Sequence, residues 1–319
     1  MKLLITGING FVARHFLDFV SKQNQEFEIL GIGRSINSFN NNHFQNLNIN
    51  YKSIDLLNKD DVSEMISKFR PDFLLHLASV SSVGYSWKHP QESFVNNTNI
   101  FLNLIDRIRI ENIKCRILSI GSSEEYGIVH KNDLPIIEEC KLNPVSPYAV
   151  ARVSQEMISQ IYTKGYNMDI VMTRSFNHFG PGQNEVFVIS SFAKQLVEIS
   201  LKKKQNRKVI VGDIDIIRDF VDVRDVVKAY YTLLTKGRKG EIYNISSGIG
   251  ISLSEILYKM CEILQIEINI DINKELIRPS DNPVIIGNSD KMKNELNWIP
   301  EISIEKSLTD MLEWWKTNL

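Results

Sequence analysis

The sequence is poor in cysteine and carries almost no net charge. Three cysteines occur among 319 residues, and the spacing of Cys115, Cys140 and Cys261 matches neither a metal site nor a redox pair. An odd number without a pattern fits the reducing cytoplasm, which is the location we expect. With 37 basic and 38 acidic side chains, the formal net charge of -1 indicates neither nucleic acid nor a membrane surface as a partner.

Long apolar runs are also absent from the sequence. No stretch is long enough to span a bilayer. Thr6, Gly7, Asn9 and Gly10 interrupt the apolar N-terminus, which does not fit a signal peptide. The length allows one large domain, or a large domain with a smaller one.

Strand and helix patterns alternate through the first half of the chain. Continuous apolar runs such as Phe73–Ala78 and Arg116–Ile120 are typical of strands buried on both faces, and His76 is expected to be a core histidine there. One long helix is predicted over Gln91–Ile110. This alternation predicts an α/β fold of the Rossmann type, a doubly wound parallel sheet. Further strands are predicted at Lys2–Thr6, Phe27–Ile32, the residues that end at Leu56, and Asp169–Thr173.

A glycine-rich turn joins the first predicted strand to the first helix. Such a turn lets the backbone approach a pyrophosphate, and the helix N-terminus favours its negative charge. We therefore predict dinucleotide binding here, with a purely structural tight turn as the alternative. The candidate residues are Gly7, Asn9, Gly10, Phe11 and Val12, with Ala13 as the last small position.

The end of the second predicted strand lacks the acidic residue that holds the ribose of NAD. Arg34 stands there and is suited to pair with a 2′-phosphate, so we predict NADP and keep NAD as the alternative. A solvated arginine is the other interpretation of Arg34. Asp55 and Leu56 are placed near the adenine, although Asp55 also fits a helix cap. Leu77 and Ala78 are further predicted cofactor contacts.

Another helix is predicted to begin with Ser146 as its cap and Pro147 at its first position. Tyr148 and Arg152 are four residues apart and share one face. A fixed cation beside a phenol favours the phenolate, so Tyr148 is a candidate general acid or base. The alternative is an exposed pair on a surface helix. Gly165 is the expected stop, and the predicted apolar stripe comprises Val150, Val153, Met157, Ile158 and Ile161.

The chain has three motifs in a fixed order: the glycine turn, the serine-rich end of a strand, and the helix that carries Tyr148. This order resembles the extended short-chain dehydrogenase/reductase family, and in particular its nucleotide-sugar-modifying branch. The resemblance covers nearly the whole chain and implies that Ser122 and Tyr148 are catalytic. It also implies that Tyr148 and Arg152 contact the cofactor. Arg152 stands where the family has a lysine that holds the nicotinamide ribose; it keeps the charge and the hydrogen bonds but does not readily release a proton. Further matching motifs are residues 174–183, 218–227 and 278–283.

The resemblance implies an NADPH-dependent reduction of the C4 keto group of a GDP-4-keto-6-deoxy sugar. The expected product is GDP-D-rhamnose or its C4 epimer. Glu124 occupies the position of the glutamate that moves a proton in related 4,6-dehydratases, so dehydration of GDP-mannose remains an alternative. A keto-heptose substrate and a cofactor-bound sensor with impaired catalysis are further alternatives. The family also suggests a homodimer through the helices that begin near Gln91 and Pro147.

The second half of the chain is expected to bind the sugar nucleotide. Arginine presents a planar fork of donors, so Arg218 and Arg278 are candidates for the pyrophosphate, with structural ion pairs as the alternative. We place the cofactor domain at 1–176, with 213–240 returning to it, and the substrate lobe at 177–212 and 241–319. The remaining candidate substrate contacts are Ser122, Ser123, Tyr148, Asn177, Lys194 and Asp281.

Overall fold

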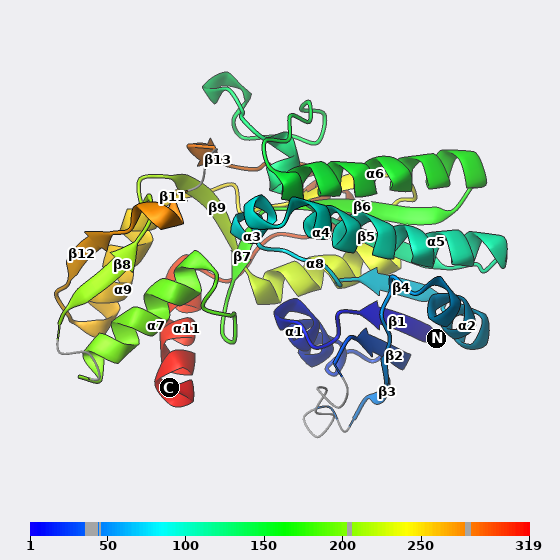
Figure 1. The fold of residues 1–319 in the computed structure, drawn as a ribbon, viewed down its shortest axis with the longest axis horizontal. Helices are drawn as coiled ribbons and strands as arrows, with labels where there is room; N and C mark the ends of the chain where they lie inside the picture. The colour runs from blue at the N-terminus through cyan, green and yellow to red at the C-terminus, as the bar shows by residue number, and fades with distance from the viewer. Residues whose placement is uncertain (36–43, 45, 203–205, 278–281) are drawn as a thin grey trace.

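The computed structural model describes residues 1–35, 44, 46–202, 206–277 and 282–319. Its larger lobe is built on a seven-stranded sheet in which every pair of neighbours is parallel, in the order β10-β6-β5-β4-β1-β2-β3 (Figure 1). This confirms the predicted doubly wound α/β fold. The strands are β1 (Lys2–Thr6), β2 (Glu28–Gly33), β3 (Asn48–Ser53), β4 (Phe73–His76), β5 (Arg116–Ser122), β6 (Asp169–Ser175) and β10 (Ile242–Ile245).

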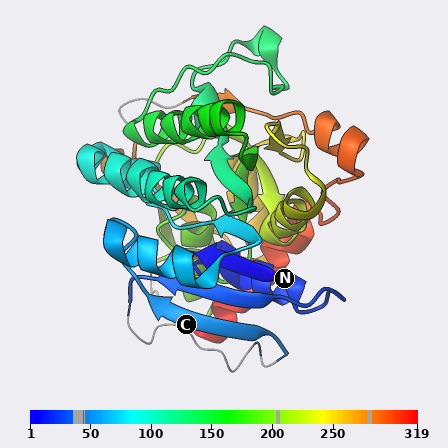
Figure 2. The same cartoon turned by 90° about the vertical axis from the view of Figure 1, so that its right-hand side faces the viewer.

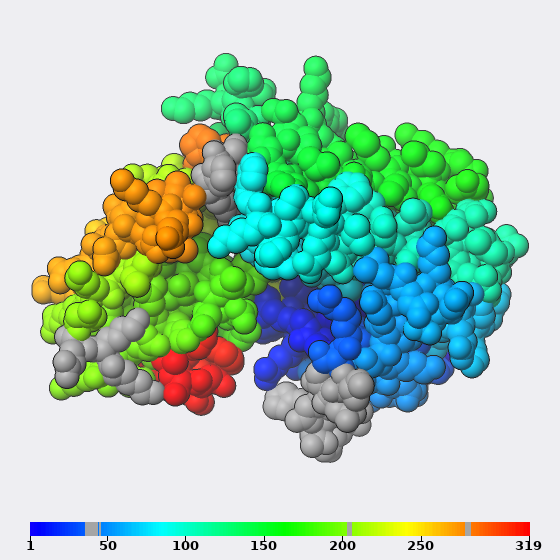
Figure 3. Space-filling model, viewed as in Figure 1, coloured from blue at the N-terminus to red at the C-terminus, as the bar shows by residue number. Residues whose placement is uncertain are grey.

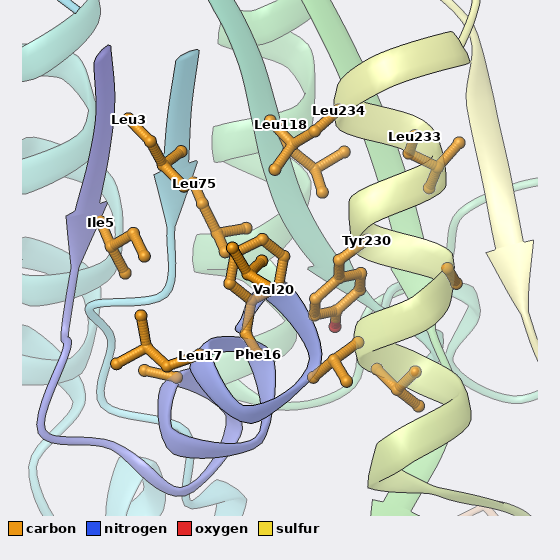
Figure 4. Packing of buried hydrophobic residues seen from close by; sticks show 14 of the residues in the cluster. Leu3, Ile5, Phe16, Leu17, Val20, Leu75, Leu118, Tyr230, Leu233 and Leu234 are labelled. Atoms are coloured by element: carbon orange, nitrogen blue, oxygen red, sulfur yellow. The ribbon is translucent and has the colours of Figure 1, made fainter. Parts of the chain in front are cut away.

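Helices cover both faces of this sheet because its strands are apolar on both sides. Alternate residues of β1 point to opposite faces, so Leu3 and Leu4 belong to different hydrophobic clusters. One face is covered by α1 (Phe11–Val20) and α8 (Val223–Lys236), and Figure 4 shows their side chains packed over the strands. On the other face α2 (Lys59–Phe69), α5 (Ile100–Ile110) and α6 (Pro147–Tyr166) lie side by side (Figure 2).

The smaller lobe has its own sheet and its own hydrophobic cluster. In its four-stranded sheet β9 (Ile217–Asp222) pairs with β11 (Gly250–Ser252), β13 (Val284–Ile285) and β7 (Asn177–Phe179). The strands β8 (Lys208–Val211) and β12 (Asn269–Ile272) form a separate pair. Three helices enclose this cluster: α7 (Val188–Ser200), α9 (Leu253–Leu264) and α11 (Ile304–Asn318).

Two of the predicted domain boundaries are wrong. Residues 241–319 were assigned to the smaller lobe, but β10 pairs with β6 and closes the edge of the larger sheet. Residues 213–240 were assigned to the larger lobe, but β9 lies in the smaller sheet and only the following α8 packs against α1. Both errors have one cause: a short strand pattern gives no information on which sheet the strand joins.

The long helix predicted over Gln91–Ile110 is interrupted. It consists of α4 (Pro90–Phe94), a π-helical turn η2 (Val95–Asn99) and α5. The buried side chain of Asn97 explains the interruption, because its Oδ1 accepts from Val80 N at 2.9 Å and its Nδ2 donates to Val80 O at 3.1 Å. The π turn thereby fixes the segment that leaves β4.

The apolar stripe predicted for α6 does not face the protein interior as a whole. Val153 is buried, but Val150, Met157 and Ile161 are 43%, 53% and 61% exposed. The face that packs on the sheet carries polar side chains instead, among them Tyr148, Arg152, Gln155, Glu156 and Ser159. The helix ends at Tyr166 with Asn167 in the left-handed conformation, so Gly165 is not its stop.

The remaining short elements connect these layers. They are α3 (Val83–Lys88), η3 (Ser123–Tyr126), η4 (Lys131–Asp133), η5 (Lys274–Leu276) and α10 (Asp290–Leu296). Across the described ranges, none of these helices or the longer ones has the length and apolarity that a bilayer span requires.

Candidate active site

The glycine turn after β1 forms a tight cradle at the carboxyl edge of the sheet. Gly7 has φ +72°, and a Cβ atom there would lie 2.8 Å from Ala78 N. Its own N–H donates to Ile32 O at 2.8 Å, and Gly10 N donates to Gly7 O at 2.9 Å, which closes the turn. Gly10 then caps α1 without a side chain, so the helix N-terminus is open to an anion.

The strands beside the cradle bring the other predicted cofactor residues to the same edge. Thr6 Oγ1 accepts from Ala78 N at 3.2 Å and Thr6 O accepts from Leu77 N, so both residues lie against the turn. Asn9 and Gly10 are exposed, while Phe11 and Val12 are half-buried. A glycine cradle against an open helix N-terminus fits the pyrophosphate of a dinucleotide.

Arg34 and Asp55 follow β2 and β3 at this edge. Arg34 is exposed, and its carbonyl accepts from the Ser53 hydroxyl at 2.9 Å, which joins the two strand ends. Asp55 is also exposed and accepts from Leu57 N at 3.0 Å, whereas Asn58 caps α2. The helix-cap interpretation of Asp55 is therefore wrong. Leu56 is buried beside it.

Ser122 lies at the end of β5, and Tyr148 lies in the first turn of α6. Ser146 caps this helix as predicted, because its Oγ accepts from Ala149 N at 3.1 Å. Helix α6 packs against η3, the turn that begins directly after Ser122. Ser122 Oγ accepts from Glu124 N at 3.2 Å, which leaves its O–H free to donate.

Arg152 is bonded to Tyr148, so the two residues predicted to share a face do so. Arg152 Nε donates to the Tyr148 hydroxyl oxygen at 3.2 Å, and its guanidinium carbon lies 5.2 Å from the centre of the Tyr148 ring. Both side chains are buried, at 7% exposure for Tyr148 and 4% for Arg152. The predicted alternative of an exposed surface pair is therefore wrong.

A buried carboxyl group that was not among the predicted site residues lies beneath Ser122. Glu125 is fully buried; its Oε1 accepts from Ser122 N at 2.6 Å, and its Oε2 has no partner among the described residues. Burial raises the pKa of Glu125 well above its usual range, and nearby Glu156 adds to this effect. The signal that would have found Glu125 is the capping box formed by Ser122 and a glutamate three residues later.

A buried ion pair lies in the same layer. Arg174 Nε and Nη2 donate to the two carboxylate oxygens of Glu156, both at 2.8 Å. Arg174 Nη1 also donates to the Tyr126 hydroxyl at 3.0 Å, and that hydroxyl donates to Asn244 Oδ1 at 2.7 Å. This network ties α6, β6, η3 and β10 together behind the site.

The predicted substrate residues are only partly brought together. Asn177 lies on β7, which pairs with β9, and Arg218 is buried on β9. Ser123 is buried in η3. Lys194 on α7 is ion-paired with Glu185 and lies over the Trp315 ring. Arg278 and Asp281 lie outside the described residues. Figure 3 shows the surface hollowed between the smaller lobe and the dark-blue N-terminal residues.

Comparison with known proteins agrees with this geometry. The chain is 30% identical to a GDP-6-deoxy-D-mannose reductase of Pseudomonas aeruginosa, over 100% of this chain and 98% of that protein. It is 29% identical to a GDP-6-deoxy-D-talose 4-dehydrogenase of Aggregatibacter actinomycetemcomitans, over 93% and 91%. The solved structure of RMD from Pseudomonas aeruginosa complexed with NADPH matches with a TM-score of 0.87 and 29% identity, covering 100% of this chain and 99% of that one.

A family model described as GDP-mannose 4,6 dehydratase matches residues 4–311, which is almost the entire chain. This match, the doubly wound sheet and the serine, tyrosine and arginine at its carboxyl edge agree with one another. The chain belongs to the GDP-mannose 4,6-dehydratase family.

Proposed function

We propose that this protein uses NADPH to reduce the C4 keto group of a GDP-4-keto-6-deoxy sugar. The observation that carries the proposal is the buried Tyr148 hydroxyl, bonded to Arg152 at the carboxyl edge of a dinucleotide-binding sheet. Relatives named as a GDP-6-deoxy-D-mannose reductase and a GDP-6-deoxy-D-talose 4-dehydrogenase, and a similar structure complexed with NADPH, support the substrate and the cofactor.

The cofactor supplies a hydride when bound, and the chain holds it at the glycine cradle. Gly7 and Gly10 allow the pyrophosphate to approach the N-terminus of α1. Arg34 is exposed where a 2′-phosphate is expected, which favours NADP over NAD. Asp55, Leu56, Leu77 and Ala78 border the adenosine and the adjoining part of the cofactor.

Tyr148 and Ser122 act on the carbonyl oxygen of the sugar. Tyr148 donates its proton as negative charge develops on that oxygen, and Ser122 donates a hydrogen bond with its free O–H. Arg152 orients the Tyr148 hydroxyl through Nε and holds the nicotinamide ribose. Burial of both side chains strengthens these electrostatic interactions, because little water competes for them.

The sugar nucleotide binds between the lobes. We assign Asn177 and Arg218, on the paired strands β7 and β9, to the diphosphate, and Lys194 to the base. We assign Arg278 to the diphosphate and Asp281 to a ribose hydroxyl on the resemblance alone.

The test is a coupled assay at pH 7. A separate dehydratase generates GDP-4-keto-6-deoxy-mannose, and this protein is added with NADPH. Loss of nicotinamide absorbance together with a new GDP-sugar supports the proposal, and the C4 configuration of the product separates rhamnose from talose. Conversion of GDP-mannose itself, without net use of NADPH, would instead establish a 4,6-dehydratase that uses Glu124. Turnover of a keto-heptose alone would change the substrate, and tight NADPH binding without any turnover would indicate a sensor.

A second copy of this chain is the partner that we propose for the exposed apolar face of α4 and α6. Phe94 and Val150 are 38% and 43% exposed, and Met157 and Ile161 more so. A shallow pocket between the two helices is lined by Pro90, Phe94, Pro147 and Val150, among others. Two copies of such a face bury each other's apolar area in an isologous dimer.

The oligomeric state tests this partner. Light scattering after size-exclusion chromatography should give the mass of a dimer for the wild-type protein and of a monomer for Ile161→Lys. A matched control is Ile249→Lys, since Ile249 is at least as exposed, at 69% against 61% for Ile161, but lies in the smaller lobe. A wild-type protein of monomer mass would contradict the dimer.

We also propose a location for the protein. Its three cysteines are unpaired, so we place it in the reducing cytoplasm.

A further inference from the structure

The guanidinium of Arg152 is anchored on the side away from Tyr148. Its Nη1 donates to Gln155 Oε1 at 2.8 Å and to Ile120 O at 3.1 Å, while Nε donates to Tyr148. Among the described residues, these three are the hydrogen bonds that its guanidinium donates, and none of them comes from Nη2. Gln155 is 1% exposed, so water does not replace its amide oxygen.

The orientation of the Gln155 amide follows from its neighbours. Gln155 Nε2 is 3.2 Å from Ile120 O, which only accepts, and 2.9 Å from Ser119 Oγ. Oε1 therefore has to face Arg152, which only donates. Ser159 Oγ donates to Gln155 O at 2.8 Å and lies 3.1 Å from Ser119 Oγ, whose own O–H can donate to it, which fixes the arrangement from behind. Ser119 and Ser159 are both buried.

The anchor determines which edge of the guanidinium faces the site. In a planar guanidinium the Nε–H bond and one Nη2–H bond are parallel and form one edge, and Nη1 lies on the other side. Holding Nη1 at Gln155 and Ile120 turns the Nε/Nη2 edge toward Tyr148. Without Gln155 only one acceptor would hold Nη1, and the flexible arginine stem would allow the group to rotate.

We propose that Gln155 is a positioning residue that makes Arg152 competent to serve Tyr148 and the cofactor. The inference rests on the proposed function, in which Arg152 orients Tyr148 and holds the nicotinamide ribose. It assigns the fixed geometry of this arginine to a buried amide on the next turn of α6 that touches neither substrate nor cofactor.

The experiment measures the dissociation constant of NADPH by fluorescence titration for wild type and Gln155→Met, and kcat by the coupled assay. Methionine keeps the volume and removes the acceptor. Loss of one buried hydrogen bond to a charged group should raise the dissociation constant and lower kcat. The two fold-changes multiplied together should be about 10 to 100. Gln160→Met is the matched control, because Gln160 lies on the same helix and bonds only to Glu156 in the described structure; it should leave both values unchanged.

The same substitution in an Arg152→Lys background separates positioning from general damage. An ammonium has no Nε/Nη2 edge to orient, so in this background Gln155→Met should change the dissociation constant of NADPH by less than about threefold. A smaller effect in the lysine background than in the arginine background shows that the two positions are coupled. An equal effect in both backgrounds, or unchanged NADPH binding and kcat in the arginine background, would overturn the proposal. If Gln155→Met does not fold, Ser119→Ala releases the amide from behind and should shift both values in the same direction.

Failure of the proposed function gives a different result. A wild-type protein that reduces no GDP-keto sugar would refute the reductase, while the NADPH titrations would still decide whether Gln155 acts through Arg152.

Discussion

Arg174 and Glu156 form a doubly hydrogen-bonded ion pair whose side chains are only 5% and 3% exposed. The pair joins β6 to the polar face of α6, behind the turn that follows Ser122. Each charge depends on the other, because neither is solvated by bulk water.

Replacing Arg174 with Met should destabilise the protein strongly. The substitution leaves the Glu156 carboxylate buried without its counterion, which costs about 3–5 kcal/mol. Urea unfolding measures the loss. Lys259→Met removes a partly exposed pair with Glu305 and should cost less than about 1 kcal/mol. Comparable losses for the two variants would contradict the special position of the buried pair.

Glu125 should make stability dependent on pH. Its pKa is raised by burial in the folded state, so its contribution to stability is fully present below the carboxyl pKa of the unfolded chain and is lost as the pH rises through the folded pKa. Glu125→Gln removes this loss. The unfolding free energy of E125Q relative to wild type should therefore increase from about pH 5 upward, by at most about 1.4 kcal/mol per pH unit. A constant difference across this range would refute a buried proton on Glu125.

Tyr148→Phe should lower kcat while NADPH still binds. The variant lacks the proton that we assign to the carbonyl oxygen, and positioned acid catalysis contributes about 10²–10⁴-fold. The coupled assay measures this loss. Tyr258→Phe makes the same chemical change at a residue that is 52% exposed in the smaller lobe and should be silent. Retention of more than about a tenth of the wild-type kcat in Y148F would assign the proton to another group.

Gly7→Ala should abolish dinucleotide binding. Alanine is strained at φ +72°, and its Cβ would lie 2.8 Å and 2.9 Å from the backbone N and Cα of Ala78. Fluorescence titration with NADPH measures the effect. The control is Gly165→Ala, because no atom lies within 4 Å of a Cβ at that helical position. This control should bind NADPH normally and be more stable by about 0.5–1 kcal/mol.

Arg34→Ala should weaken NADPH binding by about 10-fold or more and leave NADH binding unchanged. Only NADPH carries the 2′-phosphate that we assign to the guanidinium, and hydrogen bonds between charged groups are among the strong ones. Titration with both cofactors gives the ratio of the two dissociation constants. Equal losses would mean that Arg34 contacts a part that both cofactors share.

Much of the fold was predictable because its strongest signals are local. The glycine turn, the buried strand runs and the Ser146 cap each depend on a few adjacent residues, and the structure has all of them. The spacing of Tyr148 and Arg152 on one helix face was equally local, and their hydrogen bond confirms that they meet.

Other features depend on neighbours that are distant in the sequence. The apolar residues of α6 gave no sign that Met157 and Ile161 would face outward while Arg152 and Gln155 faced the sheet. Periodicity shows that a helix has two faces, but the partner decides which one is buried. The π turn at Asn97 was unpredictable for a similar reason, because its cause is the backbone of Val80, seventeen residues earlier.

The late strand β10 has a consequence for how the cofactor lobe is divided along the chain. The larger sheet takes its first six strands from residues before 176, but its edge strand and the covering helix α8 come only after the chain has entered the smaller lobe. A fragment that ends at residue 176 would lack α8, whose side chains pack in the same hydrophobic cluster as Leu118 and Val171. The cofactor lobe is therefore not complete as an N-terminal unit, because its edge strand and the α8 side of its core come from residues after 222.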